Sequence, residues 1–250
     1  MTGAGISTES GIPDFRGPDG IWTKNPDMER RAYEMYYIFL ENPKYYWENR
    51  LTSPYMPQDM YTARPNAGHF ALAEMEQMDL IKSVITQNID GLHVKAGSKK
   101  VLEYHGSIDK LRCSGCNRRF KREEYDLTTM LEEGRLPPLC PSCHSPVKDD
   151  VVHFHESIPS DVACDSIEQV NRCDMMLICG TSAVVYPFAS LPEIARDNST
   201  RKGITSLTEI AIIEINAEPT HLTRDKISDF LIQGRTSVIL SKLIEHVKNK

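Results

Sequence analysis

Four short apolar runs constrain the fold of this 250-residue chain most strongly. They span residues 84–86, 151–154, 175–179 and 210–215. Each run lacks the alternation of polar and apolar residues that marks a strand with one solvated face. Such runs predict strands that are buried on both faces, as in a parallel sheet that helices cover on both sides.

Between the runs, apolar residues recur at helical spacing in segments 71–78, 163–170 and 240–247. Pro159-Ser160 is typical of a helix start. We interpret each apolar stripe as core packing. The alternation of strands and helices predicts an α/β fold with a doubly wound, parallel, Rossmann-like sheet.

Two segments interrupt this alternation and predict a smaller domain with a zinc-binding and a helical part, inserted into the sheet domain. Residues 17–65 would form its helical and loop part, with a helix near 30–40, and residues 109–147 would form a zinc-binding module. The Rossmann-like NAD-binding domain would then comprise the remaining ranges, 1–16, 66–108 and 148–250.

Charge and composition limit the partners we expect. The net charge of −6 gives no general nucleic-acid footprint, and no run approaches the roughly 18 apolar residues of a membrane span. We see no secretory signal, so we expect a cytoplasmic protein with reduced thiols. One basic segment is interpreted as a solvated face; it contains Lys110, Arg112, Arg118, Arg119, Lys121 and Arg122.

Four of the seven cysteines form two Cys-x-x-Cys pairs, Cys113/Cys116 and Cys140/Cys143, with 23 residues between the pairs. Two such turns can supply four thiolates in a tetrahedron, which is the closed geometry of a structural zinc site. The alternatives are two redox-active or incidental pairs, or a site in which His144 competes as a ligand.

The chain opens with a glycine-rich segment, Gly3-Ala4-Gly5-Ile6-Ser7, and a second motif follows at Gly11–Gly17. Glycines allow a close approach to a pyrophosphate, but the spacing differs from the ordinary dinucleotide fingerprint, and a surface turn explains it equally well. A phosphate loop needs a strand before it, and none precedes Gly3. We therefore expect either a start further upstream or a sheet that lacks one strand and exposes an edge.

Taken together and in order, these motifs resemble the sirtuin family over nearly the whole chain. The motifs are Thr2–Ser7, Gly11–Gly17, Thr86-Gln87-Asn88-Ile89-Asp90-Gly91-Leu92-His93, His105-Gly106, the four cysteines, Gly180-Thr181-Ser182, Ile215-Asn216 and Pro219-Thr220. The resemblance implies an NAD-dependent protein-lysine deacylase that transfers the acyl group to ADP-ribose and releases nicotinamide. It also implies acylated-lysine proteins as substrates and one structural zinc ion.

The resemblance assigns roles residue by residue. His105 matches the general base, and an imidazole with an unperturbed pKa near 6.5 suits that role. Asn88 and Asp90 match the other catalytic positions, and Val152 and Phe154 the walls of the acyl-lysine tunnel. Phe15 matches a ring that shields the reactive centre, and Arg16 a phosphate anchor. The complete set of NAD-contact positions is Gly3, Ala4, Phe15, Arg16, Gln87, Gly180, Thr181, Ser182 and Asn216.

The sequence departs from the family pattern at several positions. His155 stands where the family usually has glycine, which puts the peptide preference in doubt. Lys148-Asp149 replaces a frequent Arg-Pro, and Ala183 a frequent leucine. The Tyr-x-x-Arg pair of desuccinylases does not align, so no acidic acyl preference is implied. Two alternatives remain, a protein mono-ADP-ribosyltransferase and a non-catalytic zinc-bearing binding module.

Overall fold

The computed structural model describes residues 1–52, 59–201 and 210–249. Its larger part is a parallel sheet whose strands are β1 (Val84–Thr86), β2 (Val101–Glu103), β6 (Met175–Cys179), β7 (Ala211–Asn216) and β8 (Phe230–Gln233). β2 pairs with β1, and β7 lies between β6 and β8; every pair is parallel. These pairings confirm the predicted α/β class with a parallel sheet.

Met1 and Thr2 join the two halves of this sheet. Thr2 forms parallel bridges to both Thr86 of β1 and Cys179 of β6. Its N–H donates to the Ile85 carbonyl (3.0 Å), and the Cys179 N–H donates to the Met1 carbonyl (2.9 Å). These two residues therefore lie between β1 and β6, in the position of the strand that we expected to be lacking before Gly3.

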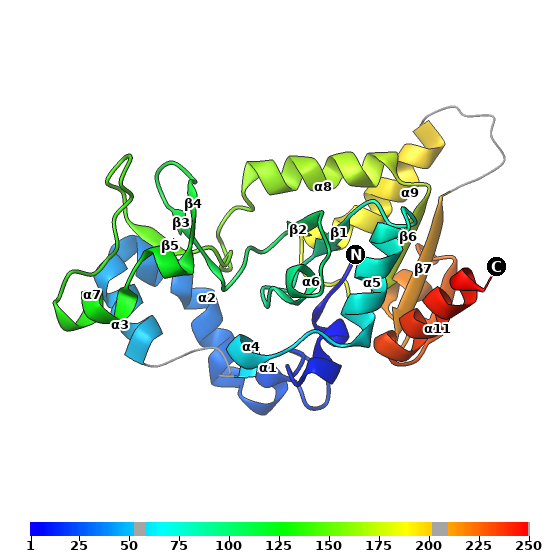
Figure 1. Ribbon diagram of the computed structural model, residues 1–250, viewed down its shortest axis with the longest axis horizontal. Coiled ribbons are helices and arrows are strands. Elements are labelled where there is room, and N and C mark those ends of the chain that lie inside the picture. Colours follow the sequence, from blue (N-terminus) through cyan, green and yellow to red (C-terminus); the bar gives the residue numbers. More distant parts are fainter. Residues whose placement is uncertain (53–58, 202–209, 250) are drawn as a thin grey trace.

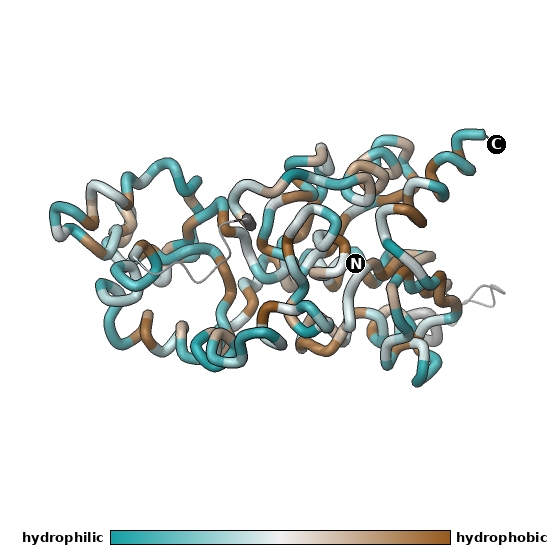
Figure 2. Tube along the Cα trace, turned by 90° about the horizontal axis from the view of Figure 1, so that it is seen from below, coloured by the Kyte–Doolittle hydropathy of each residue, from teal (hydrophilic) through white to brown (hydrophobic). Residues whose placement is uncertain are grey.

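Helices cover both faces of the sheet, as the apolar stripes predict (Figure 1). On one face, α5 (Ala67–Gln77) and α11 (Thr236–Lys248) bury Leu72 and Leu240 against Cys179 and Ile215. On the other face, α8 (Ser160–Arg172) and α9 (Leu191–Arg201) pack against the opposite side chains of β6 and β7. Along the helix that ends at the C-terminus, the colours in Figure 2 alternate between hydrophobic and hydrophilic, as expected for one buried face.

Short elements complete the sheet domain at the ends of its strands. They are η1 (Ala4–Ile6), η2 (Thr8–Ser10), α6 (Leu92–Lys95), η4 (Phe188–Ser190) and α10 (His221–Arg224). Side chains fix where two helices begin. The Asn66 side chain caps α5 by accepting from the Gly68 N–H (2.9 Å), and the Thr220 hydroxyl caps α10 by accepting from the Leu222 N–H (3.1 Å).

The smaller part lies at the other end of the molecule (Figure 1). A three-stranded antiparallel sheet has β3 (Lys110–Cys113) between β4 (Arg119–Lys121) and β5 (Val147–Asp149). The helical elements are α1 (Ile21–Lys24), α2 (Pro26–Glu41), α3 (Pro43–Thr52), α4 (Asp59–Thr62), η3 (Arg122–Glu124) and α7 (Leu127–Glu132). Phe39 of α2 and Trp47 of α3 share one apolar core with Leu111 and Val147 of the sheet, so the two insertions pack as one unit.

One predicted strand is wrong. Residues 151–154 form no strand, although Val151 is buried against Ile12, Met60 and Leu92. The apolar side chains of this segment pack against their neighbours without strand pairing. The segment leads from β5 back to the sheet domain. The strand β5 precedes it, and pairs with β3. Because β5 (Val147–Asp149) belongs to the smaller sheet, we propose the predicted domain division with the end of the zinc-binding module moved from residue 147 to residue 149.

In the three described ranges, no helix combines the length and apolar character that crossing a membrane would require.

Candidate active site and zinc site

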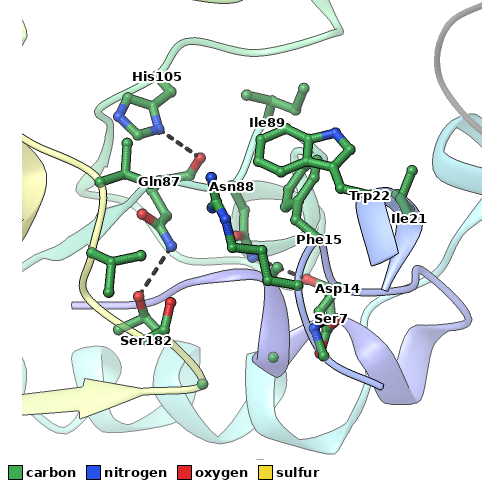
Figure 3. Close-up of a pocket in the computed structure, with 18 of the residues that line it drawn as sticks. Ser7, Asp14, Phe15, Ile21, Trp22, Gln87, Asn88, Ile89, His105 and Ser182 are labelled. Atoms are coloured by element: carbon green, nitrogen blue, oxygen red, sulfur yellow. Dashed lines mark hydrogen bonds between the residues drawn. The ribbon is translucent and has the colours of Figure 1, made fainter. Parts of the chain in front are cut away.

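A cavity of about 680 Å³ lies beyond the carboxyl ends of β1, β6 and β7. Ligands bind at this edge in open α/β sheets. His105 and Gln87 lie on one side of the cavity, and the rings of Phe15 and Trp22 on another (Figure 3).

The structure brings nearly all predicted site residues of the reaction onto the wall of this one cavity. They are Ala4, Phe15, Arg16, Gln87, Asn88, Asp90, His105, Val152, Phe154, Gly180, Thr181, Ser182 and Asn216. Gly3 is the exception. A Cβ at this position would lie 2.5 Å from the Thr181 Cβ and 2.6 Å from the Gln87 Nε2, so Gly3 packs behind the wall and lets those two side chains meet.

Hydrogen bonds hold the strand ends together at the cavity. The Gln87 amide donates to the Thr181 hydroxyl (3.0 Å), and the Asn216 amide donates to the Thr181 carbonyl (3.2 Å). The Gly5 N–H donates to the Gly180 carbonyl (2.7 Å), so the glycine-rich opening lies directly against the turn after β6.

Gly180 has no room for a side chain. Its φ is +61°, and a Cβ would lie 2.4 Å from the Ile6 nitrogen and 2.6 Å from the Gly5 carbonyl carbon. We expect Gly180→Ala to cost roughly 2–5 kcal/mol in urea unfolding, from left-handed strain together with overpacking. Gly134→Ala is the matched control, because Gly134 has φ +68° and open space around it, so only the strain of roughly 1–2 kcal/mol applies. Equal losses in the two variants would contradict the close approach.

His105 has a defined tautomer. Its Nδ1 lies 3.2 Å from the Gln87 carbonyl oxygen, which can only accept, so Nδ1 carries the proton and Nε2 keeps its lone pair. Burial lowers the pKa of His105 to about 4, although the bond to Gln87 opposes this shift. The sequence alone offers only the ordinary histidine pKa near 6.5, because it does not reveal this burial. The ring is neutral at pH 7, in the form that a general base requires.

Asn88, Asp90 and Ser7 form a buried polar cluster on the same wall. The Asn88 amide donates to the Gly3 carbonyl (3.0 Å) and to the Ser7 hydroxyl (3.1 Å). Ser7 donates to Asp90 (2.7 Å), and the Leu92 N–H donates to the other oxygen of that carboxylate (2.9 Å). Burial raises the pKa of Asp90 despite these donors. The cluster holds the side chains in place and offers amide and carboxylate groups to a polar ligand.

The loop that carries Phe15 and Arg16 packs on Trp22. The Phe15 and Trp22 ring centroids are 4.7 Å apart, and the Arg16 guanidinium lies 4.5 Å from the Trp22 ring centroid. Arg16 also pairs with Glu29 (3.3 Å). Trp22 in turn lies 5.9 Å from Phe154, so the loop and the predicted tunnel wall are in contact through this indole.

Sequence reasoning missed the roles of Ser7 and Trp22. Ser7 belongs to the opening motif, and its place in that motif was the signal that could have identified it. Trp22 carried no signal, because its contacts come from tertiary packing. Asp14, Thr220 and Arg224 also line the cavity, and their positions after a glycine-rich segment and after β7 were the available clues.

The four cysteines form a separate site. All four Sγ atoms lie within 4.8 Å of one another, with Cys113 and Cys143 at 3.3 Å and Cys116 and Cys140 at 3.7 Å. Zinc–sulfur bonds of about 2.3 Å in a tetrahedron give edges of about 3.8 Å, so the cluster fits one zinc ion. The N–H groups of Gly115 and Cys116 point at Cys113 Sγ (3.4 Å each), as suits a thiolate. His144 is exposed and outside the cluster, and none of the cysteines lines the cavity.

Comparison with known proteins identifies the family. The model of the Sir2 family matches residues 3–187. This chain belongs to the Sir2 family. Two relatives are named NAD-dependent protein deacylase 2. The one from Pyrobaculum aerophilum is 40% identical over 250 residues, which is 100% of this chain and 90% of the relative. The one from Archaeoglobus fulgidus is 42% identical over 252 residues, covering 99% of this chain and 90% of the relative.

Solved Sir2 structures share the fold. A complex of a Sir2 homologue with NAD has a TM-score of 0.75 at 36% identity, covering 99% of this chain and 88% of that chain. A complex of Sir2 with a p53 peptide and NAD⁺ has a TM-score of 0.73 at 32% identity, covering 100% of this chain and 92% of that chain. The sheet domain with an inserted zinc-binding domain is therefore the Sir2 architecture.

Proposed function

We propose that this Sir2 protein is an NAD-dependent protein-lysine deacylase, which transfers the acyl group of an acylated lysine to ADP-ribose and releases nicotinamide. The observation that carries the proposal is His105, a neutral imidazole whose Nε2 has no partner among the described residues, on the wall of a cavity that also holds the polar strand ends. The names of the relatives and the NAD-bound Sir2 structures support it.

NAD supplies an activated ribose, whose bond to nicotinamide is exchanged for a bond to the acyl oxygen. The residues of this chain hold and orient the reactants. Asn88 and Asp90 offer their polar groups to the amide and the ribose. Arg16, Thr181 and Asn216 would bind the dinucleotide.

Four further side chains act at the reacting centre or beside it. Phe15 covers the reacting carbon against water, and Val152 and Phe154 line the acyl-lysine tunnel. The Nε2 of His105 takes a proton from a ribose hydroxyl, so that this oxygen can attack the acyl carbon.

The test is incubation with an acetyl-lysine peptide and NAD. We expect release of nicotinamide in a one-to-one ratio with deacetylated peptide and acetyl-ADP-ribose. Deacetylation without NAD would overturn the mechanism. Nicotinamide release with ADP-ribose attached to protein would favour the ADP-ribosyltransferase alternative, and no turnover would favour the non-catalytic module.

The pH dependence of kcat/KM checks the state of His105. Because burial lowers the pKa of this group to about 4, the ring remains neutral as the pH falls past the ordinary histidine range. We expect no loss of kcat/KM from this group between about pH 8 and pH 5, and a fall only near pH 4, where the ring gains a proton. Circular dichroism at each pH would control for unfolding. A titration near 6.5 would contradict the buried state of the ring.

The substrate and location also remain proposals. We propose acylated proteins as partners, supported by the peptide-bound Sir2 structure. We also propose a cytoplasmic location, supported by seven cysteines that form no disulfide. An acidic acyl group is not favoured, since Arg50 is buried and pairs with Asp149 (2.5 Å).

We propose no nucleic-acid site. In the basic segment, Arg112 pairs with Asp150 (2.8 Å) and Glu156 (2.7 Å), and Arg119 pairs with Asp161 (2.5 Å). Lys110 pairs with Glu103. Internal carboxylates therefore neutralise much of this segment, which leaves few free cations for phosphate contacts.

A further inference from the structure

His155 adopts a backbone conformation that disfavours its side chain. Its φ is +67°, in the left-handed region that suits glycine and costs free energy for a residue with a Cβ. The side chain is exposed, so burial does not offset this cost. Among the residues that the structure describes, no hydrogen bond or ion pair holds the imidazole. Residues kept in a strained conformation cluster at binding sites.

The contacts of the His155 ring are aromatic. Its centroid lies 5.3 Å from that of Tyr37 and 6.0 Å from that of Tyr33, both on α2. Tyr33 also stacks on Phe154, with centroids 4.1 Å apart and the planes at 22°. Tyr37 is 52% exposed and Tyr33 is 38% exposed, so both rings present surface to solvent. We call His155, Tyr33 and Tyr37 the aromatic rim.

The aromatic rim adjoins the place where a substrate polypeptide would bind. Val152, Phe154 and His155 all line the cavity. Within the described ranges, the N–H groups of Phe154 and His155 and the carbonyl of Val152 have no hydrogen-bond partner. An open backbone edge of this kind accepts an extended peptide by strand addition. Because an extended chain advances about 3.3 Å per residue, a residue one or two positions from the acyl-lysine would pass over His155.

The surroundings of the aromatic rim favour an uncharged aromatic side chain of the substrate over a charged one. The nearest carboxylate in sequence, Glu156, is taken up by Arg112 (2.7 Å) and Lys148 (3.1 Å). The rim itself offers ring faces and edges. Flat aromatic groups gain from offset or edge-to-face contact with such rings.

We propose that the aromatic rim determines peptide specificity, by accepting an aromatic side chain of the substrate next to the acyl-lysine. The proposal rests on the proposed deacylase function and deepens it. An aromatic residue next to the acyl-lysine is then the feature of the substrate that this chain selects. The sequence alone left this peptide preference open.

The test compares acetyl-lysine peptides that differ at one position. The reference peptide has alanines around the acetyl-lysine, and the others carry a single Phe, Glu or Arg at each of the two positions on either side. We expect Phe at one of these positions to raise kcat/KM about three- to tenfold over alanine, mainly through a lower KM. Equal rates for Phe and alanine at every position, or a stronger preference for Glu or Arg, would overturn the proposal.

Variants assign the preference to the rim. His155→Gly relaxes the backbone, so it should fold, and Tyr37→Ala removes the more exposed ring. We expect the ratio of Phe to alanine peptide to fall towards one in both variants. Tyr45→Ala is the matched control, since Tyr45 is 51% exposed but lies on α3 outside the cavity wall, and it should keep the ratio. A ratio that survives both rim variants would contradict the proposal.

The two proposals fail in different ways. If no peptide releases nicotinamide with the unmodified protein, the deacylase function fails. If all peptides turn over but show no preference for Phe, only the role of the aromatic rim fails.

Discussion

His105→Ala should reduce deacylation by roughly 10²- to 10⁴-fold, the usual contribution of a positioned general base. The variant removes the Nε2 of His105, whose lone pair is available because Nδ1 is bonded to the Gln87 carbonyl (3.2 Å). Alanine cannot take a proton from a ribose hydroxyl. The measurement is kcat at saturating acetyl-lysine peptide, and kcat/KM from rates at varied peptide concentration.

Binding of NAD should change little in the same variant. The Gln87 and Asn216 side chains are held by bonds to Thr181, and these bonds do not involve the imidazole. Calorimetric titration of the variant with NAD would check this. His246→Ala is the matched control, because His246 is an exposed histidine on α11, remote from the cavity wall, and should leave the rate unchanged. A surviving rate in His105→Ala would show that another group is the base.

The sequence predicted the parts of the fold that depend on burial. The runs at 84–86, 175–179 and 210–215 correspond to β1, β6 and β7, because most of their side chains are apolar and are buried in the sheet domain. The same reasoning misassigned 151–154, since buried side chains do not require a strand. It also missed β8, whose Phe230 is 63% exposed, and β2, which is only half-buried. Edge strands carry a weaker apolar signal than central ones.

The site was predictable where the residues follow strands. Gln87 comes directly after β1, Thr181 follows β6 with one residue between, and Asn216 is the last residue of β7. All three lie at the carboxyl ends of parallel strands, so the topology alone brings them to one edge. The structure was needed for properties that arise from distant segments. The lowered pKa of His105, the place of Gly3 behind the wall and the bond from Ser7 to Asp90 all depend on residues that are far apart in the chain.

Cys140→Ser should remove zinc and unfold the zinc-binding module. A serine hydroxyl is a poor substitute for a thiolate, and in zinc-finger peptides the metal contributes about 10–16 kcal/mol of apparent folding free energy. Cys113 and Cys140 are fully buried in the core that also contains Phe39 and Trp47. The loss would therefore reach α2 and α3. We expect zinc content to fall well below one ion per chain and the thermal midpoint to drop.

Cys164→Ser is the matched control, because it removes a thiol that is not a zinc ligand. Cys164 is an exposed, unpaired cysteine on α8, so its replacement should change neither zinc content nor stability. Since none of the four clustered cysteines lines the cavity, activity in Cys140→Ser should fall in proportion to the folded fraction, with no separate loss of kcat. A stable, zinc-free Cys140→Ser protein would contradict a structural role for the metal. A fully folded variant with lost turnover would instead indicate that the metal takes part in the chemistry.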